Sequence, residues 1–229
     1  MQYIGVIVLT LMFWKLIQKK NYAEMGLINI KLGYKNLIKG LLIGCISITI
    51  VFITLLYSKN LKSGNLLVND VDSINNLKNI IIFICIGFSE EVLFRGLILS
   101  NLKQMYKNSV AIGVASGIFA LMHGFNSGIC VLGYINLFIA GVLFSYMVIK
   151  SKNLWFPIGY HITWNYFEGA IFGFKVSGIN VKSIYTIKSL QDNVLTGGRF
   201  GPEGGLIVTI VLFLGLIYTW KFIDCSKHG

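Results

Sequence analysis

The chain has 229 residues, of which 55% are apolar and only 13% are charged, and its mean hydropathy is +0.72. A water-soluble domain carries about a quarter charged residues, so this composition excludes an ordinary globular enzyme and a disordered protein. It indicates a polytopic membrane protein. A spanning helix uses about 20 residues, so we expect a single membrane domain over residues 1–229 with an all-α fold of about seven spans.

Seven continuous apolar blocks follow one another along the chain, and each predicts a helix. They cover residues 3–17, 37–57, 80–99, 110–123, 131–149, 154–174 and 206–222. The first block lacks a basic n-region and a small-residue cleavage site, so we expect a retained span rather than a signal peptide. Three G-x-x-x-G pairs, Gly40/Gly44, Gly113/Gly117 and Gly169/Gly173, permit close approach of helices, although such pairs arise easily by chance among 25 glycines.

The formal net charge of +11 comes from lysines that stand singly between apolar blocks, which is typical of positive-inside flanks and predicts no nucleic-acid partner. With the first span running inward, 12 basic residues, including Lys227, are cytoplasmic and 7 are outside, as is Glu203. This bias predicts an outside N-terminus and a cytoplasmic C-terminus. The cysteines, Cys45, Cys85, Cys130 and Cys225, form no C-x-x-C pair and are assigned no role.

The third block, residues 80–99, contains three charged residues, Glu90, Glu91 and Arg95. Its thirteen Val, Ile, Leu and Phe residues supply roughly 4 to 8 kcal/mol of insertion free energy, whereas three central charges cost about 7 to 10 kcal/mol. These charges therefore need partners or a water-filled cavity. Glu91 and Arg95 are i,i+4 neighbours and can pair, while Glu90 lies about 100 degrees round the helix and stays available.

The fourth and sixth blocks add further polar residues. Phe119 and His123 are i,i+4 neighbours in the fourth block, and His161 and Asn165 are i,i+4 neighbours in the sixth. Glu168 follows His161 by seven residues on the same predicted face, and we assign it a structural role.

Depth along the helices indicates that these polar groups meet. At 1.5 Å per residue, Glu90 lies about 15 Å from the outer end of its helix. His123, His161 and Asn165 lie about 20, 10 and 16 Å from the inner ends of theirs. All four positions are compatible with one buried polar site near the middle of a core of roughly 30 Å.

The chemistry of this set suits amide hydrolysis. A buried carboxylate can take a proton from water, a neighbouring histidine can orient that water, and a second histidine with an asparagine can donate hydrogen bonds to an oxyanion. Two histidines and one glutamate are also a catalytic zinc set, which here would be Glu90, His123 and His161. Zinc is therefore a possible cofactor, and the residues leave the metal question open.

The motifs resemble those of the CPBP family, the CAAX-protease and bacteriocin-processing intramembrane proteases, also called the abortive infection family. E-E-x-x-x-R appears as Glu90, Glu91 and Arg95, F-x-x-x-H as Phe119 and His123, and H-x-x-x-N as His161 and Asn165. The motif-bearing core covers about residues 80–174.

The resemblance implies an intramembrane peptidase of glutamate or metallo type. In it, Glu90 and His123 activate water, His161 and Asn165 form the oxyanion hole, and Glu91, Arg95 and Phe119 support the site. The expected partners are the bilayer and a membrane-associated peptide or protein substrate. The composition favours a bacterial plasma membrane. The alternatives are a non-catalytic scaffold or bacteriocin-immunity protein that keeps the fold, and a small transporter, which should show an internal repeat that this chain lacks.

Overall fold

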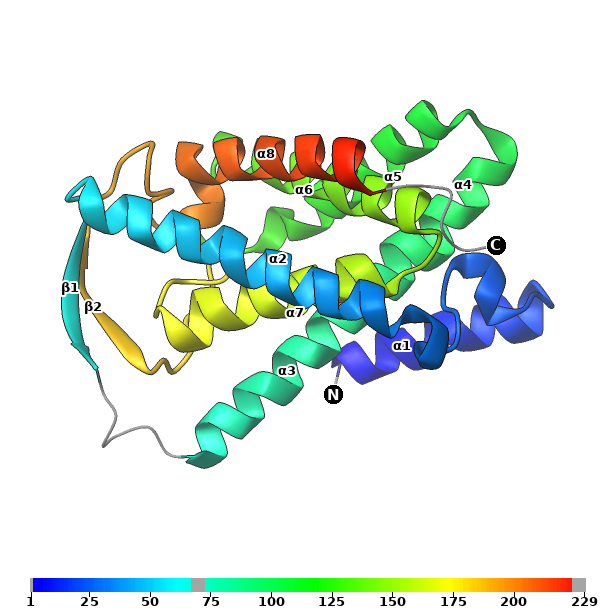
Figure 1. The fold of residues 1–229 in the computed structure, drawn as a ribbon, viewed down its shortest axis with the longest axis horizontal. Helices are drawn as coiled ribbons and strands as arrows, with labels where there is room; N and C mark the ends of the chain where they lie inside the picture. Colours follow the sequence, from blue (N-terminus) through cyan, green and yellow to red (C-terminus); the bar gives the residue numbers. More distant parts are fainter. Residues whose placement is uncertain (1, 67–72, 224–229) are drawn as a thin grey trace.

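The structure, a computed structural model, describes residues 2–66 and 73–223. Cys225 and Lys227 lie outside the described residues. The main helices are α1 (Gln2–Met12), α2 (Ile30–Tyr57), α3 (Ser73–Glu91), α4 (Ser100–Met105), α5 (Asn108–Met122), α6 (Val131–Ser151), α7 (Trp155–Asn165) and α8 (Leu206–Phe222) (Figure 1).

Shorter helical segments join or extend these helices. Three of π type continue α1, α3 and α7, as η1 (Phe13–Ile17), η3 (Val92–Leu99) and η5 (Tyr166–Ile171). Three of 3-10 type are η2 (Tyr22–Met25), η4 (His123–Phe125) and η6 (Pro202–Gly204). The predicted all-α bundle is confirmed, because each of the seven apolar blocks forms a helix.

Two helices, α2 and α3, each begin seven residues before their apolar blocks. α2 starts at Ile30 because Asn29 caps it, its side chain accepting a 2.9 Å hydrogen bond from the backbone N–H of Lys31. α3 starts at Ser73, in a polar stretch that hydropathy alone does not mark as helical. Apolarity thus located the membrane part of each helix and missed its polar end.

The number of spans differs from the number of helices. Among the described residues, three segments are long and apolar enough to cross a membrane by length and composition: Tyr22–Tyr57, Asn108–Phe125 and Val131–Ser151. Gln2–Ile17 and Leu206–Phe222 are shorter apolar helices. Many large apolar side chains on these helices are exposed, as expected of surfaces that face lipid.

A small sheet accompanies the helices and was not predicted. Strand β1 (Leu61–Leu66) pairs antiparallel with β2 (Tyr185–Leu190), with Leu61 opposite Leu190 and irregular register further along. The sheet lies beyond one end of α2, at the left of Figure 1. The sheet joins two segments that lie outside the apolar blocks and were expected to be polar connections.

Helices α2 and α7 pack at the centre of the fold, as Figure 1 shows, and glycines permit their close approach. A Cβ atom added at Gly40 would collide with the backbone carbonyl of Phe156, and one at Gly44 would collide with that of Tyr160. Gly159 of α7 lies equally close to the backbone of α2 at Leu37. The close approach that the Gly40/Gly44 spacing permits occurs here, and it fixes the helix that carries His161.

The other two glycine pairs do not join helices in this way. Among the described residues, a Cβ added at Gly113 or Gly117 would meet nothing within 4 Å, so the close approach that this spacing permits does not occur here. Gly169 faces the side chains of Val176 and of Phe83 in α3, and Gly173 has a φ of +75°, so it serves a turn. The spacing of two glycines does not say which face of a helix is buried.

The difference between two of these pairs gives a test of the packing. Gly40→Leu should destabilise the folded protein by about 3 kcal/mol, at the upper end of the cost of overpacking, because the added side chain meets backbone that cannot move aside. Gly117→Leu is the matched control and should change stability little. Thermal unfolding of both purified variants in detergent measures the difference. Equal melting temperatures would contradict the packing described for α2 and α7.

Candidate active site

The residues of the candidate site lie where regular α-helix ends. Glu90 and Glu91 are the last residues of α3, before the π-helical segment η3. Asn165 is the last residue of α7, before the π-helical segment η5. His123 begins the 3-10 turn η4 at the end of α5. Such local changes of helix type are frequent at functional sites, because they redirect side chains that α periodicity would place elsewhere.

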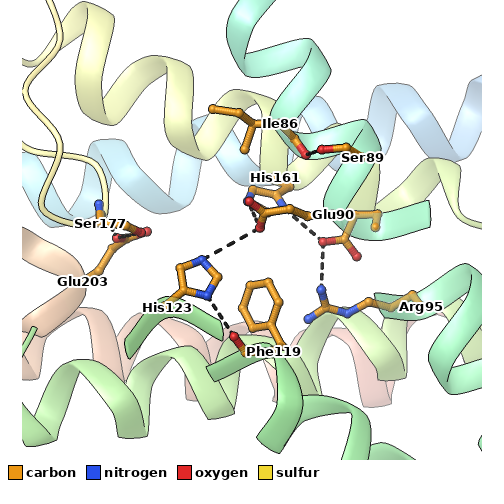
Figure 2. Close-up of polar contacts among 10 residues, drawn as sticks. Ile86, Ser89, Glu90, Arg95, Phe119, His123, His161, Ser177 and Glu203 are labelled. Carbon is orange, nitrogen blue, oxygen red and sulfur yellow. Dashed lines mark hydrogen bonds and ion pairs between the residues drawn. The ribbon is translucent and has the colours of Figure 1, made fainter. Parts of the chain in front are cut away.

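Glu90 lies between the two histidines, as Figure 2 shows. Its Oε2 atom is 3.9 Å from Nε2 of His123 and 3.8 Å from Nε2 of His161. Among the described residues this oxygen has no hydrogen-bond partner, although it is buried. The structure therefore brings Glu90, His123 and His161 together around an unsatisfied carboxylate oxygen.

The other ring nitrogen of each histidine is held by a hydrogen bond. Nδ1 of His123 lies 2.8 Å from the carbonyl oxygen of Phe119, and Nδ1 of His161 lies 2.9 Å from Oε1 of Glu91. A carbonyl and a carboxylate both accept, so each Nδ1 carries the proton. In the neutral form of each ring, Nε2 is then an unprotonated acceptor turned toward Glu90.

Glu91 and Arg95 form a buried ion pair beside this cluster. Nη1 of Arg95 donates to Oε1 of Glu91 at 3.0 Å, and the two side chains are 1% and 0% exposed. The pairing was predicted from the i,i+4 spacing. The sequence did not show that the same oxygen of Glu91 also binds His161. Glu91 therefore orients His161 through one oxygen atom, and Arg95 neutralises the charge of Glu91 at the same atom.

Phe119 supports both the arginine and a histidine. The Arg95 guanidinium carbon lies 4.3 Å from the centroid of the Phe119 ring, within range of a cation–π contact. The Phe119 ring also lies 4.7 Å from the ring of His123, and its carbonyl holds that histidine. The F-x-x-x-H spacing therefore places one aromatic residue between two polar members of the site.

Two cavities meet at this cluster. The outer cavity, of about 300 Å³, is lined by Glu90 and by residues of α1, α3 and the 176–179 turn. The inner cavity, of about 40 Å³, lies between α6, α7 and α8. His123, His161 and Asn165 line both cavities. Asn165 is only 4% exposed. Because Glu90 lines the outer cavity and the other three residues line both, all four predicted site residues border one connected polar region.

Ser177 and Glu203 also belong to this region, and the sequence analysis missed them. Oε2 of Glu203 accepts hydrogen bonds from the backbone N–H of Ser177 at 2.7 Å and from its hydroxyl at 2.6 Å. Burial raises the pKa of the Glu203 carboxyl, against the opposing effects of these hydrogen bonds and of the nearby histidines. Both residues lie in connections between helices, and Glu203 was predicted only as an outer charge.

Glu168 is fully buried in η5 and lines neither of these two cavities. The seven-residue spacing from His161 assumed α periodicity, which ends when η5 begins at Tyr166. Glu168 therefore does not line the cavities that His161 lines, although its carboxyl group interacts electrostatically with that of Glu203.

The donor types at the cluster suit zinc, but their spacing is wide. Two ring nitrogens and a carboxylate oxygen are common zinc ligands, and histidine ligands are usually held at their other nitrogen, as here. Ligands of tetrahedral zinc lie about 3.4 Å apart, so the 3.8 and 3.9 Å separations would have to close by about half an ångström. Over residues 2–66 and 73–223, no group of three or more His, Cys, Asp or Glu side chains meets the spacing of a metal site.

The fold and this cluster define an all-α membrane protein in which two glutamates and two histidines lie together beside two cavities. Residues 75–167 match one family model, which is described as type II CAAX prenyl endopeptidase Rce1-like. This segment contains all three motifs, and the match confirms the resemblance to the CPBP and CAAX-protease family. It relates the chain to CAAX-type endopeptidases in general. No curated protein and no solved structure matches the chain.

Proposed function

We propose that the protein is an intramembrane endopeptidase that hydrolyses a peptide bond of a membrane-associated protein or peptide. The observation that carries this proposal is the unsatisfied Oε2 atom of Glu90, which faces Nε2 of both His123 and His161 beside two cavities. A buried acceptor without a partner is costly, so a functional ligand or proton explains why the fold keeps it. The family match over residues 75–167 supports the same class of reaction.

Glu90 and His123 are proposed to activate the attacking water. Separations of 3.8 to 3.9 Å are too long for direct hydrogen bonds, and a water molecule that bridges such groups satisfies them. Its two protons can be donated to Glu90 Oε2 and His123 Nε2. Glu90 then takes one proton as the water attacks the peptide carbonyl. His123 accepts a hydrogen bond from the water and so orients it for the attack.

His161 and Asn165 are proposed to stabilise the oxyanion. Because Nδ1 of His161 already donates to Glu91, Nε2 can donate to an oxyanion only when the ring is an imidazolium. The carboxylates of Glu90 and Glu91 on either side favour this charged form. The Asn165 amide would supply the second donor. Hydrogen bonds of this kind contribute about 100- to 1,000-fold in rate.

Glu91, Arg95 and Phe119 are proposed to position this machinery. Glu91 orients His161, Arg95 balances the charge of Glu91, and Phe119 packs against Arg95 while its carbonyl orients His123. None of the three has to contact the substrate for this purpose. We also propose that the chain lies in a bacterial plasma membrane with its N-terminus outside.

A metallopeptidase with the same residues is the second candidate, favoured by the three acceptors that converge on one point. Glu90, His123 and His161 would hold the zinc ion, which would supply Lewis-acid activation of water. In that case His161 would leave the oxyanion hole, and Asn165 would remain there. Glu91 and Phe119 would orient the two histidine ligands as they do in the structure.

Cleavage of membrane-anchored peptides by the purified protein in liposomes, with and without a chelator, tests the proposal. We expect cleavage that the chelator leaves unchanged if Glu90 and His123 activate water without a metal. Chelator-sensitive cleavage, with stoichiometric zinc that is lost in both His123→Ala and His161→Ala, would select the metallo form. A folded wild-type protein that cleaves no peptide would favour the scaffold instead.

A further inference from the structure

The inner cavity is lined in part by three of the proposed catalytic residues. His123, His161 and Asn165 are shared with the outer cavity, so a substrate bound across them can reach inward. The remaining walls are mostly apolar side chains of α6, α7 and α8, among them Leu137, Ala140, Phe144, Trp164, Val208 and Leu212. Ser177 is shared with the outer cavity as well, and Asn136 and Glu203 add further polar lining.

The cavity is small. Its volume is about 40 Å³, and on the same measure one water molecule needs about 10 to 15 Å³, so the cavity has room for about three. A group of one to three heavy atoms is therefore the largest that enters without movement of the walls. The side chains of alanine, serine and threonine meet this limit, and those of leucine, phenylalanine and lysine exceed it.

Glu203 gives the cavity a hydrogen-bonding wall. Within the described residues, both hydrogen bonds to its carboxyl group end on Oε2, where Ser177 donates twice. A carboxyl group has further acceptor capacity on its second oxygen. A substrate hydroxyl group can donate a hydrogen bond to this second oxygen. A methyl group of similar size cannot.

A network of hydrogen bonds holds the segment around Glu203 in place. Asn136 of α6 donates to the backbone carbonyls of Glu203 at 2.8 Å and Gly205 at 2.9 Å, and its own oxygen accepts from Thr209 at 2.6 Å. Ser177 has a φ of +46°, which a serine rarely adopts. The strain is maintained by its two bonds to Glu203, so the carboxyl group and the turn form one fixed unit.

From this geometry we propose that the inner cavity is a specificity subsite for a substrate residue next to the scissile bond. It selects a small hydroxyl-bearing side chain, serine or threonine, through its volume and through Glu203. This inference rests on the proposed endopeptidase function. It adds Glu203 as a specificity-determining residue and Ser177 as the residue that positions it.

The first test uses the wild-type protein in liposomes and a set of anchored peptides that differ only at the residues flanking the scissile bond. Ser and Thr should be cleaved about tenfold or more faster, in kcat/KM, than Ala at one of the two flanking positions, because a hydrogen bond to a carboxylate is lost with Ala. Leu and Lys at that position should be cleaved most slowly, because they exceed the cavity.

Two variants separate the two causes of the preference. Glu203→Gln keeps the size of the side chain, and should reduce the Ser-over-Ala preference to within about threefold because the charge-assisted bond is lost. Leu212→Ala, or Val208→Ala if the first does not fold, enlarges the cavity and should raise cleavage of the Leu peptide relative to Ser. Glu24→Gln is the matched control, since Glu24 lies in the short helix before α2 and lines neither cavity.

The outcomes are distinguishable from those of the proposed function. Cleavage of all peptides at similar rates, or the same loss on every peptide in Glu203→Gln, would mean that the cavity holds only water, and would overturn this inference while the endopeptidase stands. A selective loss for Ser and Thr peptides in Glu203→Gln supports it. Failure of the folded wild-type protein to cleave any peptide would overturn both.

Discussion

Glu90→Gln should abolish peptide cleavage while leaving the protein folded and inserted. Glutamine has nearly the same shape but cannot take the proton of the attacking water, and loss of a general base lowers rates by about 100- to 10,000-fold. Folding should be unaffected, because Oε2 of Glu90 has no hydrogen-bond partner among the described residues that the substitution could remove. Initial rates with an anchored peptide, and melting temperature in detergent, measure the two effects.

Glu24→Gln serves as the control for removal of one acidic charge. It should keep wild-type activity, because a glutamine at this position can still complete the capping box with Asn21. If Glu90→Gln cleaved as fast as this control, Glu90 would not be the base. If it failed to fold, Glu90 would be a structural residue.

Arg95→Ala should have the largest effect on folding. It leaves the carboxylate of Glu91 buried without its cation, and breaking a buried ion pair in this way costs about 3 to 5 kcal/mol. It also removes the guanidinium from the face of Phe119. We expect little folded protein in membranes, measured as the monodisperse fraction after detergent extraction.

Lys103→Ala is the matched control for Arg95→Ala, since Lys103 is an exposed basic residue on the neighbouring α4. Its yield should match that of the wild type. Normal yield and stability of Arg95→Ala would show that Glu91 finds another partner, and the account of the ion pair would be wrong.

The fold could largely be predicted from the sequence because the membrane imposes one rule. Backbone polar groups in hydrocarbon must be paired within the segment, so each long apolar run has to be a helix. The sheet of β1 and β2 could not be predicted in this way, since its strands lie outside the apolar blocks and pair across more than a hundred residues. The ends of α2 and α3 depend on caps and polar residues that hydropathy does not report.

The candidate site could be predicted in part. The cost of burying Glu90 and Glu91, and the depth of His123 and His161, placed these residues near one another, and the structure brings them together. Glu203 and Ser177 were not predicted, because each reads as an ordinary polar loop residue. Only the tertiary fold brings Ser177 and Glu203, 26 positions apart, against the same cavity.

The π-helical segments explain a further difference. Predictions beyond Glu91 and Asn165 used a period of 3.6 residues, and this period fails where η3 and η5 begin. The Glu91–Arg95 pair still forms across the change. Glu168 does not line the cavities that His161 lines.

The central claim is that water, activated at Glu90, hydrolyses a peptide bond directly. A single-turnover reaction of the wild-type protein with an anchored peptide in water enriched in oxygen-18, followed by mass spectrometry of both fragments and of the protein, tests it. The account predicts two fragments, one solvent oxygen in the new carboxylate and no fragment attached to the protein at any time. Absence of cleavage by folded protein, or a fragment covalently bound to it, would contradict the account.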